Sequence, residues 1–172
     1  MIILIVILIF ILINEAIQSI YRQFQRRYIY KLAINRAKQT NKKLTVIGDP
    51  YYGKGSQFWN SIIKGYDCGD ITVDLTGAPK CPNGIKSDIL KFLKTQKDNS
   101  QIIFISCVLE YVNNIEDVVK ELYRVSGGPQ NLFIVTVKNY SFAAYFYKED
   151  NYSSKYIIKA PPEYQSISWT PI

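Results

Sequence analysis

The sequence predicts an α/β fold, in which a mostly parallel sheet is flanked by helices. Two apolar runs rich in β-branched residues, 101–109 and 132–137, have the length and the lack of alternation that are typical of strands buried on both faces. Between them, apolar residues recur at helical spacing from Asn113 to Val125. Gly127-Gly128-Pro129 then ends the predicted helix. A strand, a helix and a strand of these lengths form a right-handed βαβ unit.

Residues 1–20 are predicted to form a membrane-anchor helix, either single-pass or peripheral. Residues 1–13 are an unbroken apolar run, and the helix becomes long enough to cross a bilayer if it continues to Ile20. A signal peptide is an alternative, but it would need a basic region before the run and small residues at a cleavage site. A buried core helix is the other alternative, although soluble helices are rarely apolar on every side.

Residues 21–43 are predicted to form a basic amphipathic helix and linker. The first 43 residues hold eight of the 21 Lys and Arg and a single acid, so the formal charge of +7 belongs to this arm. Such a helix either lies in the lipid headgroup region or packs on the domain by its apolar stripe. In the first case, the positive-inside rule places the domain on the cytosolic side. The stripe consists of Ile17, Ile20, Tyr21, Phe24, Tyr28 and Leu32.

The composition argues against several classes of function. From residue 44 onward the charges balance, so no basic face for nucleic acid is expected. The absence of histidine excludes Ser-His and Cys-His mechanisms. Three separated cysteines (Cys68, Cys81 and Cys107) are too few for a typical zinc site and do not describe a disulfide framework. We therefore expect no metal, and free thiols in a reducing compartment.

A glycine-rich turn follows the first predicted strand of the domain, 44–47. It contains Gly48 and Gly53 and leads into a predicted helix, an arrangement that can cradle a nucleotide-like ligand. A P-loop is an alternative, because Gly48, Gly53 and Lys54 fit its spacing. Gly55, however, stands where a P-loop needs a magnesium-binding hydroxyl. A turn that binds no ligand is the third interpretation.

Two further strands are predicted to end in chemically useful residues. Asp74 lies at the end of the strand 69–75, where an acid hydrogen-bonds ribose hydroxyls in dinucleotide-type folds. Capping of the following turn is the alternative role for Asp74. Glu110 and Tyr111 follow the strand 101–109 and are the groups expected to face a substrate. Glu110 could instead cap the next helix.

Several of these segments resemble a known family. Phe104–Val112, then Glu121-Leu122-Tyr123-Arg124-Val125, then Gly127-Gly128, resemble the second half of class I S-adenosylmethionine-dependent methyltransferases, which have a Rossmann-like fold. The resemblance spans residues 44–137, and Tyr111 stands where the family usually has histidine. The acid that the family carries inside its first strand is absent.

The resemblance implies S-adenosylmethionine as the cofactor. Gly48 and Gly53 would then shape its pocket, Asp74 would bind its ribose, and Asp88 would lie near its adenine amine. Methyl transfer needs mainly positioning of an already activated cofactor, so the lack of histidine does not exclude it.

The chain departs from this family after residue 137. We expect the domain to cover 44–150 and an extended tail rich in aromatic residues and proline to cover 151–172, where it could bind a protein partner. The expected function is a membrane-anchored methyltransferase-like protein with an unknown acceptor. The alternative is a non-catalytic, membrane-anchored structural or interaction protein on the same scaffold, for example in a large virus particle or an organelle complex.

Overall fold

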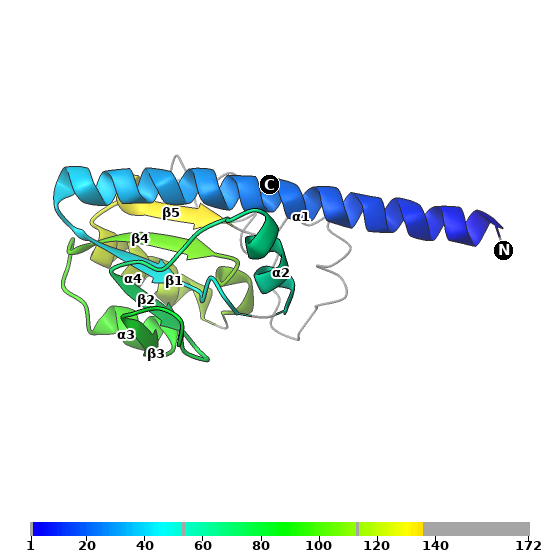
Figure 1. The fold of residues 1–172 in the computed structure, drawn as a ribbon. Helices are drawn as coiled ribbons and strands as arrows, with labels where there is room; N and C mark the ends of the chain where they lie inside the picture. Colours follow the sequence, from blue (N-terminus) through cyan, green and yellow to red (C-terminus); the bar gives the residue numbers. More distant parts are fainter. Residues whose placement is uncertain (1, 53, 113, 136–172) are drawn as a thin grey trace.

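The order of the secondary-structure elements follows the predicted α/β pattern (Figure 1). The computed structural model describes residues 2–52, 54–112 and 114–135. The helices and strands are α1 (Ile2–Thr40), β1 (Lys43–Ile47), α2 (Lys54–Ile62), β2 (Ile71–Asp74), β3 (Gly84–Lys86), α3 (Ile89–Lys94), β4 (Gln101–Ser106), α4 (Ile115–Ser126) and β5 (Leu132–Val135). Two 3-10 turns, η1 (Leu109–Tyr111) and η2 (Pro129–Asn131), flank α4.

The five strands form one sheet in the order β3-β2-β1-β4-β5, and every neighbouring pair is parallel. All residues of β4 and β5 are buried, as the continuous apolar runs predict. The β4–α4–β5 unit is confirmed, with α4 ending at Gly127 in the left-handed conformation (φ 73°). The predicted α/β, Rossmann-like fold is therefore confirmed.

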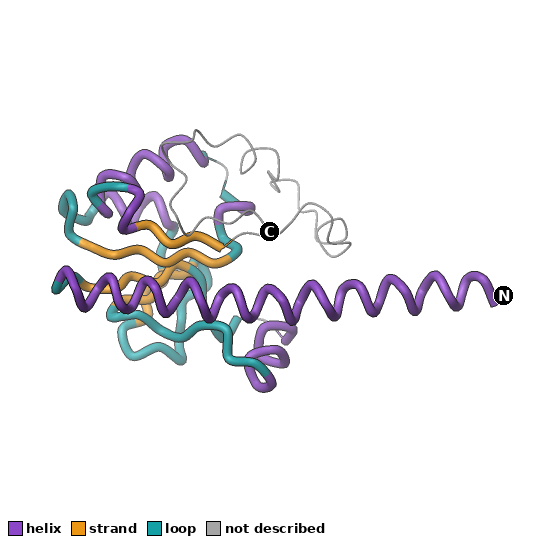
Figure 2. The backbone as a smooth tube through the Cα atoms, turned by 90° about the horizontal axis from the view of Figure 1, so that it is seen from above, coloured by secondary structure: helices purple, strands orange, loops and turns teal. Residues whose placement is uncertain are grey.

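Helices cover both faces of the sheet. On one face, α3 and α4 bury Phe92, Leu93, Val118 and Leu122 against the strands. On the other face, the C-terminal half of α1 buries a stripe of small and aliphatic residues against the strands (Figure 2). That stripe is Ile29, Ala33 and Ala37, and it meets Leu44, Val46, Ile102, Phe104, Phe133 and Val135.

The N-terminal arm is one continuous helix, so the anchor (1–20) and the basic amphipathic helix (21–43) are not separate elements. The basic half packs on the domain, but not by the expected stripe. All six side chains of that stripe are exposed, from Ile17 to Leu32, whereas Ala33 is fully buried. Small side chains on the opposite side of the helix let its backbone approach the sheet closely.

The N-terminal half of α1 extends beyond the sheet, where its side chains from Ile3 to Phe10 are exposed. By length and composition, α1 contains a segment able to span a membrane.

The cysteines correct the sequence analysis. Cys68 and Cys81 form a disulfide, so the expectation of free thiols throughout is wrong. Cys68 precedes β2 and Cys81 precedes β3. Because β2 and β3 are parallel neighbours, the two segments that enter them lie side by side. Only Cys107 remains a free thiol among the three cysteines.

Candidate functional site

The predicted site residues gather at one edge of the sheet. In a parallel sheet the carboxyl ends of all strands lie at the same edge, and ligands bind there at the point where the strand order reverses. Gly48 follows β1, Asp74 ends β2, Asp88 follows β3, and Glu110 and Tyr111 lie in η1 after β4. Gly53 lies outside the described residues.

Gly48 lies at the switch point, between the two strands that neighbour β1. Its φ is +103°, a conformation that side chains other than glycine's rarely adopt. A Cβ atom there would lie 2.9 Å from Val108 Cγ2 and 3.3 Å from the carbonyl oxygen of Ser106. Glycine thus lets the end of β1 pack against the end of β4. The close approach that requires glycine here is thus between β1 and β4, two segments of the protein itself.

A buried tyrosine lies beside Gly48. Tyr66 is buried, its hydroxyl lies near Gly48, and its ring centroid lies 5.1 Å from that of Phe104. Burial raises the pKa of Tyr66, and the nearby Arg26 guanidinium offsets only part of that rise. The hydroxyl therefore stays neutral around pH 7.

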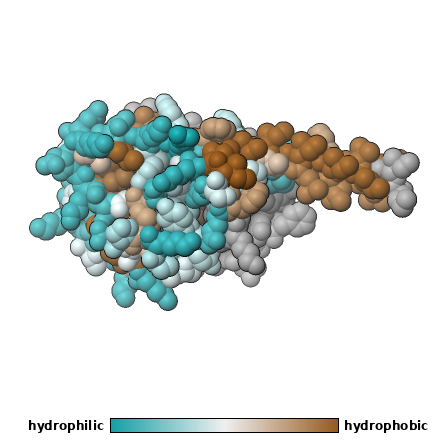
Figure 3. All heavy atoms as spheres, in the orientation of Figure 1, coloured by the Kyte–Doolittle hydropathy of each residue, from teal (hydrophilic) through white to brown (hydrophobic). Residues whose placement is uncertain are grey.

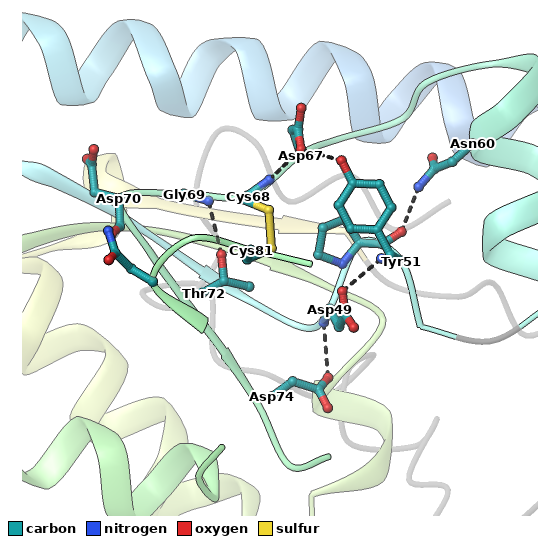
Figure 4. Close-up of a disulfide and its surroundings, with 12 residues drawn as sticks. Asp49, Tyr51, Asn60, Asp67, Cys68, Gly69, Asp70, Thr72, Asp74 and Cys81 are labelled. Atoms are coloured by element: carbon teal, nitrogen blue, oxygen red, sulfur yellow. Dashed lines mark hydrogen bonds between the residues drawn. A yellow bond between two sulfur atoms is a disulfide. The ribbon is translucent and has the colours of Figure 1, made fainter. Parts of the chain in front are cut away.

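The carboxylate of Asp74 is engaged in three hydrogen bonds within the protein. Oδ1 accepts from the amide of Thr76 at 2.8 Å and from its hydroxyl at 2.7 Å. Oδ2 accepts from the amide of Asp49 at 3.0 Å (Figure 4). Asp74 thus closes the turn after β2, the alternative role that its sequence position left open, and also joins that turn to the loop after β1.

The remaining predicted site residues lie at the same edge in different roles. Asp88 is exposed and caps α3, since its Oδ1 accepts from the amide of Lys91 at 3.0 Å. Tyr111 is exposed in η1. The residue that precedes α4 as its N-cap is Asn114, not Glu110.

No protein-family model, curated protein or solved structure matches this chain. The fit of S-adenosylmethionine is therefore judged from the geometry alone. A cofactor at this edge would need open space beside Gly48, but Tyr66 and Val108 lie there. It would also need carboxylate oxygens that point outward, but internal hydrogen bonds engage Asp74. These described residues do not fit the cofactor as the resemblance implies, and we derive no methyl-transfer step.

One contact at this edge was missed by the sequence analysis. Arg26 of α1 donates from Nη2 to Cys107 Sγ at 3.1 Å. Cys107 directly follows β4 and has a φ of +53°. The contact fixes the middle of α1 at the carboxyl end of the central strand. The sequence gives only a weak signal for this contact, because Arg26 is one of several cations in a basic segment.

A second network surrounds the disulfide (Figure 4). The hydroxyl of Tyr51 donates to Asp67 Oδ1 at 2.6 Å, and this hydrogen bond, with burial, raises the pKa of Tyr51 to about 12. Burial alone would raise the pKa of Asp67, but hydrogen bonds from Lys64 and Tyr51 bring it below its usual value. The hydroxyl of Tyr30 donates to the carbonyl of Cys68 at 2.6 Å, which ties α1 to the same loop.

Proposed function

We propose that this chain is a membrane-anchored α/β protein with a non-catalytic, structural or interaction role. The observation that carries the proposal is the engagement of Asp74, the expected ribose-binding acid, in three internal hydrogen bonds. The apolar, exposed half of α1 supports the anchor. On this proposal the side chains at the strand ends stabilise the fold.

A second candidate is retention of S-adenosylmethionine binding. It is supported by the strand order β3-β2-β1-β4-β5, whose switch point lies between β1 and β4, and by a glycine at that point. Asp74 accepts three hydrogen bonds within the protein, and a carboxylate has about four acceptor positions, so about one remains for a ribose hydroxyl. A single remaining acceptor position predicts weak affinity.

Titration calorimetry on the full chain in lipid nanodiscs separates the two candidates. S-adenosylmethionine and S-adenosylhomocysteine are injected into the wild-type protein and the Asp74→Asn variant, which keeps a carboxamide oxygen as acceptor. Absence of heat with both ligands supports the structural role. Saturable binding to the wild-type protein that Asp74→Asn weakens would overturn it in favour of the cofactor.

Two features bear on which side of the membrane the domain occupies, and they disagree. The cations that follow the apolar segment favour the cytosolic side. The Cys68–Cys81 disulfide favours an oxidising compartment, since disulfides are rare where thiols are kept reduced. Because the basic arm favours the anionic cytoplasmic leaflet, we propose the cytosolic side, and the disulfide makes the oxidising side the alternative. Digestion of the domain by protease added to sealed microsomes would support the cytosolic side, whereas protection would support the oxidising side.

The tail 151–172, expected to bind a protein partner, lies outside the described residues. That partner remains a proposal from the sequence.

A further inference from the structure

The direction of α1 fixes which edge of the sheet is near its apolar end. α1 ends at Thr40, and only two residues separate it from the start of β1 at Lys43, so it packs along the sheet in the direction opposite to the strands. Its N-terminal half therefore passes beyond the carboxyl ends of the strands. In Figure 1 the arrowheads of β4 and β5 point toward the projecting end of α1, and Figure 2 shows that end of the helix extending beyond the strands.

The Arg26–Cys107 contact gives the level at which α1 leaves the sheet. Cys107 is the first residue after β4, so Arg26 lies at the carboxyl edge. The anchor segment 2–20 lies beyond it, which is about 29 Å of helix at 1.5 Å per residue. The hydrocarbon core of a bilayer is about 30 Å thick. A bilayer that contains this segment therefore begins close to the carboxyl edge.

Exposed apolar side chains of the domain gather at the same edge. Within the described residues 43–135, the large hydrophobic residues that are exposed are Tyr52, Phe58, Ile62, Leu75, Ile85, Tyr111 and Tyr123. All but Ile85 and Tyr123 lie in the segments that follow the carboxyl ends of β1, β2 and β4. The exposed apolar side chains of the domain are therefore concentrated on the side from which the apolar half of α1 emerges.

The helix α2 is the most prominent part of this apolar edge. It contacts α1, and Phe58 and Ile62, one helical turn apart, are 57% and 59% exposed. Trp59 lies beside them, with its ring 5.2 Å from that of Phe58 in an edge-to-face arrangement. Figure 3 shows apolar side chains along the projecting part of α1 and next to the point where it meets the domain.

We propose that the carboxyl edge of the sheet faces the bilayer that α1 enters, and that α2 contacts the lipid headgroup and acyl boundary through Phe58 and Ile62. This proposal rests on the membrane anchor of the proposed function and adds a second, independent lipid contact. The occupant of the edge is an anionic lipid surface. Aromatic rings next to apolar side chains are the composition that such interfaces favour.

Charge argues for lipid over a second copy of this chain. Arg22 and Arg27 lie on the part of α1 near this edge, where Glu15 is the one acidic residue of the helix, whereas Lys64 is paired with Asp67. Two copies joined at this surface would bring like charges together. Anionic headgroups would neutralise them, at about 1 kcal/mol for each cation near the surface.

Fluorescence of Trp59 tests the proposal in the full chain. The chain has two tryptophans, so Trp169→Phe leaves Trp59 as the single reporter. The protein is reconstituted into phosphatidylcholine vesicles with phosphatidylglycerol that carries bromine at shallow or deep acyl positions. We expect shallow bromines, at the depth of roughly 5–10 Å where interfacial apolar faces lie, to quench Trp59 roughly twofold and deep bromines to quench it less.

Matched variants and flotation separate the possible failures. Phe58→Gln with Ile62→Gln should abolish quenching, whereas Tyr123→Gln, an exposed aromatic position near the end of α4 that leads to the amino end of β5, should leave it unchanged. If the wild-type protein floats with vesicles but shallow bromines do not quench Trp59, the lipid contact is wrong and the anchor stands. If the protein does not float, the anchor itself fails. Shielding of Trp59 from both bromine and aqueous iodide that increases with protein density would assign the surface to a second copy and overturn the proposal.

Discussion

The amide of Asp49 donates to Asp74 Oδ2 at 3.0 Å and so joins the loop after β1 to the turn after β2. These loops belong to adjacent parallel strands whose ends would border a ligand in a nucleotide-binding sheet. The bond places the acid with the strongest sequence signal inside the framework of the protein. Asp74 therefore contributes to stability even if no ligand binds.

Replacement of Asp74 by alanine should destabilise the fold. It leaves the part-buried amide of Asp49 without its acceptor, which costs about 1–3 kcal/mol in the free energy of unfolding, whereas the exposed amide of Thr76 can bond water. Denaturant unfolding of the full chain in detergent micelles measures the change. Asp88→Ala is the control, because loss of an exposed helix cap costs about 1 kcal/mol. Equal stability of Asp74→Ala and wild type would mean that the carboxylate is free for another role.

The disulfide should contribute to stability mainly by restricting the unfolded chain. Cys68 and Cys81 are 13 residues apart, and a loop of this size corresponds to about 3 kcal/mol. Cys68→Ser should therefore lower the free energy of unfolding by about 2–4 kcal/mol. Cys107→Ser keeps the disulfide and serves as the matched control.

Alkylation followed by mass spectrometry checks the same bond directly. In denaturant without reductant, only Cys107 should react. Modification of all three cysteines would show that the bond does not form in the cell, and it would support the prediction of a reducing compartment.

The Tyr51–Asp67 hydrogen bond predicts an unusual titration at high pH. Because the pKa of Tyr51 is raised to about 12, the neutral phenol is favoured in the folded state. The resulting stabilisation is complete below pH 10, the ordinary tyrosine value, and is lost as the pH rises through about 12. Asp67→Ala removes the acceptor and with it the first cause of the shift, so the pKa of Tyr51 should fall toward 10.

Nuclear magnetic resonance of ring-labelled tyrosine, assigned with Tyr51→Phe, measures this pKa. A titration of Tyr51 that Asp67→Ala leaves unchanged would contradict the hydrogen bond. The same bond, with that from Lys64, holds the pKa of Asp67 below its usual value, so its contribution to stability is lost only in acid.

The two sides of α1 should respond differently to the same new side chain. Ala33 is fully buried against the sheet, so Ala33→Leu overpacks that contact and should cost about 1–3 kcal/mol in unfolding free energy. Asn35→Leu places leucine on the exposed side of the helix and should change stability by less than about 0.5 kcal/mol. Thermal unfolding in detergent compares the two variants. A reversed order would mean that α1 packs by the stripe predicted from the sequence.

That stripe shows where sequence patterns were insufficient. The strands were predictable because β4 and β5 are continuous apolar runs, and Gly127 marked the end of α4. On α1, the bulky exposed stripe hides the packing face, whose contacts come from the small residues Ala33 and Ala37. Small side chains give a weak hydrophobic signal although they permit the closest packing.

The sequence predicts where the candidate site residues lie, but not which groups their side chains contact. Asp74, Asp88 and Tyr111 reach one edge because each follows a parallel strand, and strand ends can be read from the sequence. The partners of these side chains depend on which loops meet in space. The same reason explains the missed disulfide, since Cys68 and Cys81 are brought together only by the pairing of β2 with β3.

Alkaline extraction of membranes from cells that express the full chain tests the anchored α/β domain most directly. The account predicts that the wild-type chain stays in the membrane pellet. Ile9→Arg with Leu12→Arg should move it to the supernatant, because each arginine near the centre of a span costs about 3 kcal/mol. Ile85→Arg, on the edge strand β3, should stay in the pellet. A wild-type chain that enters the supernatant would contradict the account.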